Sequence, residues 1–107
     1  MNMEIKELTE LVVKFRNARN WDRTQDYKDF AMALIAEAAE VVEHFKWHTP
    51  EQMKQYVAIH KDGIGDELSD VLFWVLLMSH DLDIDIVEAY KKKMKKNALK
   101  YPIKEEK

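Results

Sequence analysis

The chain has 107 residues, 17 Lys and Arg against 20 Asp and Glu, and a formal net charge of -3. This length suffices for one core, so we expect a single domain over residues 1–107. The charge excludes the broad positive surface that binds nucleic acid, and the longest apolar run, residues 71–78, is too short to cross a bilayer. The absence of cysteine excludes disulfides and thiolate metal sites. We therefore expect a soluble, cytoplasmic protein with neither nucleic acid nor a membrane as partner.

The low number of turn residues predicts an all-α fold. Only two glycines and two prolines occur, fewer than a sheet protein of this size requires at its turns. Apolar side chains at steps of three and four predict a first helix from about Glu4: Ile5, Leu8, Val12 and Phe15. The polar stretch 17–28 then predicts a connection, in which Trp21 is the one large apolar side chain.

A second helical stripe follows this connection and contains an acid: Phe30, Leu34, Glu37, Val41 and Phe45. Thr49, Pro50 and Gln52 then combine an N-cap, a proline at the first helical position and a capping-box residue, which predicts the start of a short helix. Residues 62–65, with two glycines, predict its end, and a further helix is expected over about 66–80.

The last predicted helix begins at the cap formed by Asp85 and Glu88 and ends near Lys100, before Pro102. Before it, residues 71–78 are apolar at eight successive positions, which covers the whole circumference of a helix. One small bundle cannot bury that circumference. We therefore expect subunits to associate, most simply about a two-fold axis.

Two pairs of acids border apolar stripes on different predicted helices. Glu37 with Glu40, and Glu67 with Asp70, are each three residues apart, so each pair projects from one helical face. One interpretation is that all four are solvated surface charges. The other is that they converge, in which case their repulsion requires a cation, and ligands that are all oxygen favour Mg²⁺ or Mn²⁺ over zinc or copper.

The order of these motifs resembles one family over nearly the whole chain, the MazG-type all-α nucleoside triphosphate pyrophosphohydrolases, and within it the dCTP-pyrophosphatase-like branch. The resemblance rests on five segments: residues 19–22, 37–47, 66–72, Lys93 with Asn97, and 100–102. It implies a four-helix bundle assembled as an oligomer, and more closely a tetramer built as a dimer of dimers.

The resemblance also implies roles for individual residues. The Mg²⁺ ligands, and thereby the catalytic residues, would be Glu37, Glu40, Glu67 and Asp70, with Mn²⁺ as a substitute ion. The nucleotide would be bound by a larger set: Trp21, Gln25, Lys28, Trp47, Trp74, Lys93, Asn97 and Tyr101. The implied reaction is hydrolysis of the α,β-phosphoanhydride of a (deoxy)nucleoside triphosphate, most closely dCTP, to monophosphate and pyrophosphate, in nucleotide-pool house-cleaning.

Two positions depart from the family pattern. Ala36 stands where the wider family has a further Glu before the first ligand, which leaves the general base open between the four ligands and Glu43. Gln25 stands where the dCTP-selective members have a His, and Tyr27 where they have a Pro. The preference for a base is therefore expected to be looser than in those members.

Two other classes of protein share some of these features. Ferritin-like di-iron bundles use Glu-x-x-His pairs, and this chain has none. A non-catalytic helical module that associates and binds nucleotide or metal explains the apolar run but not an acid at position 37 of a core stripe. Trp74, inside the apolar run, serves the core or the nucleotide equally well, and the four histidines are interpreted as surface residues.

Overall fold

The computed structural model describes residues 3–104. Four α-helices follow one another along the chain: α1 (Ile5–Ala18), α2 (Tyr27–Glu43), α3 (Pro50–Asp81) and α4 (Ile86–Lys100). A single turn of 3₁₀ helix, η1 (Trp21–Arg23), lies in the connection between α1 and α2. No strand occurs among the described residues, so the predicted all-α fold is confirmed. None of these helices has the length and apolar character that a bilayer span requires.

Side-chain caps define where three of the helices begin. Asp26 accepts from the Asp29 amide and the Asp29 carboxylate accepts from the Asp26 amide, which closes a capping box at α2. Thr49 and Gln52 form the equivalent box at α3, as the sequence predicts. The predicted cap at Asp85 is also present, because its carboxylate accepts from the amide of Glu88.

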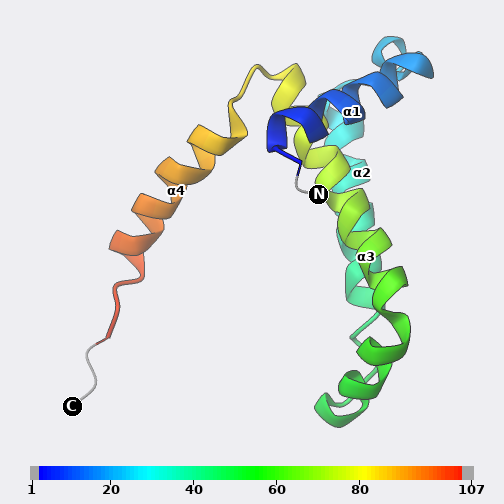
Figure 1. Ribbon diagram of the computed structural model, residues 1–107, viewed down its shortest axis with the longest axis vertical. Helices are drawn as coiled ribbons and strands as arrows, with labels where there is room; N and C mark the ends of the chain where they lie inside the picture. Colours follow the sequence, from blue (N-terminus) through cyan, green and yellow to red (C-terminus); the bar gives the residue numbers. More distant parts are fainter. Residues whose placement is uncertain (1–2, 105–107) are drawn as a thin grey trace.

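The predicted break at residues 62–65 is wrong. Helix α3 continues through Gly63 and Gly65, and its only non-helical residue is His60, with φ −110° and ψ 22°. A glycine inside a helix costs only about 1 kcal/mol, and α3 packs along α2 over this stretch (Figure 1). The packing outweighs the local preference, so a kink replaces the expected loop.

The core lies where α1, α2 and α3 meet. Its buried side chains are Val12 of α1, Phe30 of α2, and Leu76 and Leu77 of α3. Phe73, Trp74 and Met78 pack against this core from α3 and are half-buried. Only part of the apolar circumference of residues 71–78 is thus covered within one chain.

Helix α4 diverges from the other three helices (Figure 1). Ile86, its first residue, packs against the core, but no residue of α4 is buried. Side chains at steps of three and four along α4 form an apolar stripe that is exposed to solvent: Val87, Tyr90 and Met94. The closed bundle that the resemblance implies is therefore not completed by the α4 of the same chain.

Candidate metal and nucleotide site

The two predicted acid pairs face each other across α2 and α3. One carboxylate oxygen from each of Glu37, Glu67 and Asp70 lies within 4.8 Å of the others. The carboxyl group of Glu40 lies close enough to this group to raise the pKa of both Glu37 and Glu67. The spacing of three residues puts both members of a pair on one helical face, and the packing of α2 against α3 brings the two faces together.

The proximity of these acids disfavours their ionised forms. The hydrogen bond with Glu40, then desolvation and the charges of Glu40, Glu37 and Asp70, raise the pKa of Glu67 to about 7. Burial, followed by the hydrogen bond and charge of Glu40, also raises the pKa of Glu37. At neutral pH the negatively charged acids of the cluster therefore repel one another.

The donor atoms of this cluster fit a hard divalent cation. Oε2 of Glu37 is buried and has no hydrogen-bond partner among the described residues. A buried, unpaired carboxylate oxygen is costly, and coordination of a cation removes that cost. The set contains only carboxylate oxygens, the ligands that Mg²⁺ and Mn²⁺ prefer.

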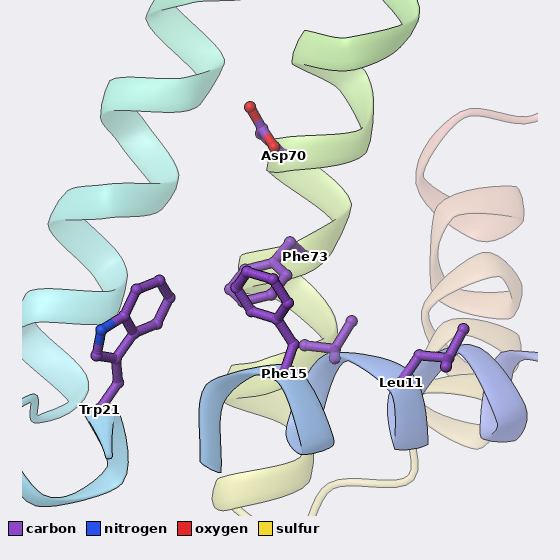
Figure 2. A pocket seen from close by; sticks show the side chains of 6 residues that line it. Leu11, Phe15, Trp21, Asp70 and Phe73 are labelled. Atoms are coloured by element: carbon purple, nitrogen blue, oxygen red, sulfur yellow. The ribbon is translucent and has the colours of Figure 1, made fainter. Parts of the chain in front are cut away.

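A pocket of about 420 Å³ opens beside the cluster. Its lining is apolar and largely aromatic except for one carboxylate: Leu11, Val12, Phe15, Trp21, Asp70 and Phe73 (Figure 2). Asp70 belongs to both the cluster and the pocket. This volume and lining suit a flat ligand that carries a negatively charged group at one end.

Phe15 is the central ring of the pocket wall. It meets Trp21 edge to face at a centroid distance of 5.7 Å and Phe73 at 5.8 Å. The guanidinium of Arg19 lies over the same Phe15 ring, with its Cζ 3.5 Å from the ring centroid. Three elements, α1, η1 and α3, thus contribute one aromatic ring each to the wall.

Only two of the pocket residues, Trp21 and Asp70, were predicted as site residues from the sequence. Phe15 was expected in a buried stripe, and Phe73 in the apolar run expected to associate with other subunits. The structure leaves Phe15 44% exposed in the pocket. Apolar periodicity gave no signal for this difference, since a pocket wall and a core have the same spacing.

One of the predicted nucleotide contacts lies near the core, and two lie at or just before the start of α2. Trp74 packs on Phe30, at a centroid distance of 5.8 Å, and belongs to the half-buried layer around the core. Gln25 has a buried Oε1 without a hydrogen-bond partner among residues 3–104, four residues after Trp21. Lys28 is exposed in the first turn of α2. None of Trp74, Gln25 and Lys28 lines the pocket.

None of the remaining predicted contacts lines the pocket. Trp47 follows the end of α2; its ring is 74% exposed, with the Lys46 ammonium 4.8 Å from its centroid. Lys93, Asn97 and Tyr101 lie on or directly after α4, which diverges from the cluster (Figure 1). Within one chain, the structure therefore brings together the four acids and Trp21, but not the residues of α4.

Removal of charge from the cluster is expected to stabilise the cation-free protein. Because the pKa of Glu67 is raised above its unfolded value, the folded state binds more protons between about pH 4.5 and 7, and stability falls as pH rises through this window. In excess chelator, Glu67→Gln should melt at a higher temperature than wild type at about pH 8, and the difference should vanish near pH 5.

The matched control is Glu10→Gln, which removes an exposed acid of α1 outside the cluster. Its melting temperature should follow that of wild type at both pH values. Equal melting of wild type and Glu67→Gln at the higher pH would show that the four acids do not repel one another.

The fold and the cluster define an all-α protein with a carboxylate site between two helices. Comparison with known proteins identifies a family with which this description agrees. The MazG-like family model matches residues 33–107. The chain belongs to the MazG-like family.

Individual relatives were also found. The dCTP pyrophosphatase 1 of Bos taurus is 24% identical over 101 residues, and that of Homo sapiens is 25% identical over 100 residues. Each alignment covers 92% of this chain, but only 60% and 59% of the two relatives, so the chain spans about three fifths of their length. A crystal structure of a pyrophosphatase from Archaeoglobus fulgidus matches with a TM-score of 0.86 and 30% identity, and covers 96% of both chains.

Proposed function

We propose that residues 1–107 act as one domain that hydrolyses (deoxy)nucleoside triphosphates at the α,β-phosphoanhydride, with Mg²⁺ as cofactor. The observation that carries this proposal is the junction of the acid cluster with the aromatic pocket at Asp70. The cluster suits a cation that binds phosphates, and the pocket suits the nucleoside. The names of the relatives, dCTP pyrophosphatase and pyrophosphatase, support the same reaction.

In the proposed reaction, Glu37, Glu67 and Asp70 would hold the cation, with Glu40 beside them. A divalent cation, when bound, neutralises phosphate oxygens and acidifies a water molecule. Water adds to a phosphorus atom flanking the α,β bridge, and cleavage of that bridge releases monophosphate and pyrophosphate. No protein nucleophile is required.

Glu40 is the acid that we assign to accept the proton of the attacking water. Its carboxyl group is exposed and contacts Glu37 and Glu67, but it does not belong to the three closest oxygens. Glu43, the other candidate, is paired with Lys46 at 2.5 Å, and this hydrogen bond lowers its pKa. A carboxylate with a lowered pKa is a weaker base, so Glu43 is the poorer choice.

The nucleoside is assigned to the pocket beside Asp70. Phe15 and Trp21 present aromatic surface there, and stacking of a base on such a ring contributes about 1–3 kcal/mol. Gln25 does not line the pocket but lies four residues after Trp21, and we assign its unpaired Oε1 as an acceptor for an amino group of the base. We therefore propose a preference for deoxycytidine that is looser than in relatives with a His at this position.

Helix α4 is assigned to the site of a second copy of the chain. It carries six lysines between residues 91 and 100, opposite in charge to the four acids of the cluster. It also leaves its apolar stripe without a partner in its own chain. Association of subunits, as a dimer or as a dimer of dimers, would cover the stripe and bring Lys93 and Asn97 to the phosphates.

Light scattering at micromolar concentration is expected to give a mass of at least two chains. Met94→Lys, which puts a charge into the apolar stripe of α4, should shift the mass toward one chain. Leu99→Lys changes an exposed leucine outside the stripe and should leave the mass unchanged. A wild-type protein that stays monomeric would contradict the assignment of α4.

The proposed function is tested by kcat/KM for the four canonical dNTPs, with Mg²⁺ and with excess chelator. We expect turnover only with the cation, highest for dCTP, and with smaller differences among the four for wild type than for Gln25→His. Strict dCTP selectivity in wild type would show that Gln25 does not loosen the preference. Nucleotide binding without any turnover would instead favour the non-catalytic module.

A further inference from the structure

A buried ion pair joins α1 to the C-terminal end of α3. Arg16 is only 5% exposed, and its Nη1 and Nη2 donate to Oδ2 and Oδ1 of Asp81 at 2.5 and 2.9 Å. Its Nε donates to Oδ1 of Asn17 at 2.7 Å. All three guanidinium nitrogens thus have acceptors, and the two parallel bonds to one carboxylate fix the direction of the side chain.

Asp81 also connects this pair to α2. Its backbone carbonyl accepts from the hydroxyl of Tyr27, the first residue of α2, at 3.2 Å. Its carboxylate further contacts Nδ1 of His80 at 3.0 Å. One residue at the end of α3 therefore fastens both the C-terminal half of α1 and the start of α2.

The aromatic wall of the pocket depends on where α1 is held. Helix α1 has two buried residues, Val12 and Arg16, which are four positions apart, and its Leu8 and Val13 pack half-buried against the core. The wall residues Leu11 and Phe15 are 53% and 44% exposed, so burial alone does not fix their positions. Phe15 directly precedes Arg16, and Trp21 follows in η1 (Figure 2).

We propose that Arg16 and Asp81 are positioning residues for the nucleoside pocket: their ion pair sets the place of Phe15 and Trp21 opposite Phe73 and Asp70. Neither Arg16 nor Asp81 lines the pocket, so both act through the wall. This inference rests on the proposed function, because the pocket is taken to be the nucleoside site.

An ion pair suits this role better than an apolar contact. Apolar side chains pack in several registers at similar energy, whereas a guanidinium and a carboxylate with two parallel hydrogen bonds have one. Replacement of a buried pair by apolar side chains of similar size is often neutral for stability, whereas removal of one partner is strongly destabilising. The apolar double variant therefore separates positioning from stability.

The test compares Arg16→Met/Asp81→Leu with wild type and with His80→Ala. The His80 variant removes the other side-chain partner of Asp81 but leaves α1 attached. Three quantities are measured: the melting temperature, kcat and KM for dCTP with Mg²⁺, and the ¹⁹F resonances of 5-fluorotryptophan-labelled protein. The three tryptophan resonances are assigned with Trp→Phe variants.

We expect the double variant to melt within a few degrees of wild type and to raise KM about tenfold, with kcat changed much less, because the wall contacts the base and not the phosphates. The Trp21 resonance should shift while that of Trp47 stays in place. His80→Ala should match wild type in all three quantities. Should the double variant not fold, Arg16→Lys, which keeps the charge but cannot make the two parallel hydrogen bonds, is measured in the same way, with the same expected rise in KM at little change in kcat.

An unchanged KM together with an unmoved Trp21 resonance, in a variant that folds, would overturn the positioning role and leave the proposed function intact. A wild-type protein that hydrolyses no dNTP would instead overturn the proposed function. In that case the Trp21 resonance still decides whether the ion pair sets the wall.

Discussion

Asp70→Asn is expected to lower kcat for dCTP hydrolysis by at least about 100-fold while the helical content stays that of wild type. Even partners that only hydrogen-bond to metal ligands typically contribute about 10- to 100-fold. Asp70 is one of the three acids with closely spaced oxygens, so its effect should be at least as large. The substitution keeps the shape of the side chain and removes a charge that the other acids repel, so the fold should not suffer.

The matched control is Asp66→Asn, which makes the same chemical change one turn earlier on α3, at an exposed position outside the cluster. Its kcat should stay within about twofold of wild type. Glu40→Gln should lose activity as Asp70→Asn does, since Glu40 is the proposed base. Full turnover by Asp70→Asn would mean that the cluster does not hold the catalytic cation.

Lys93→Ala is expected to lower kcat/KM by about 10- to 100-fold, and by a similar factor for every dNTP. A hydrogen bond to a charged group contributes about 1.5–3 kcal/mol, which corresponds to this range of rates. The effect should not depend on the base, because a contact to phosphate does not distinguish one base from another. Kinetics with the four dNTPs measure both the size of the loss and its uniformity.

Lys95→Ala serves as the control, since it removes the same charge from α4 two positions away, on a different helical face. It should change kcat/KM little. A second control mixes Lys93→Ala with Asp70→Asn subunits. If α4 acts in the site of a second copy, some mixed oligomers contain one intact site and recover activity. Mixtures that remain inactive would assign Lys93 to its own chain or to no site.

The parts of the fold that depend on neighbouring residues could be predicted from the sequence. The caps at Thr49 and Asp85 follow from side chains that bond to amides three residues later. The prediction of a helix break at residues 62–65 was wrong for two reasons. Glycine disfavours a helix only weakly, and the packing of α3 along α2 is not visible in a local sequence pattern. The divergence of α4 from the other three helices could not be predicted either, because an amphipathic helix has the same sequence pattern whether or not it packs on its own chain.

The candidate site could also be predicted only in part, where its residues are neighbours in one helix. Acids three residues apart on apolar faces predicted the cluster, because regular helices put each pair on one face. The pocket could not be predicted in full, since Phe15 and Phe73 have the periodicity of core residues. Nothing in the sequence indicated that Arg16 is buried in an ion pair either. Its partner Asp81 lies 65 positions later, and only the fold brings the two side chains together.

The function proposed for the acid cluster is hydrolysis at the α,β bridge of a nucleoside triphosphate. It is tested most directly by ³¹P NMR of the products formed from dCTP by wild-type protein with Mg²⁺. This function predicts resonances of dCMP and pyrophosphate in equal amounts, and none of either in excess chelator. Formation of dCDP and orthophosphate, or the same products from Asp70→Asn at the wild-type rate, would contradict it.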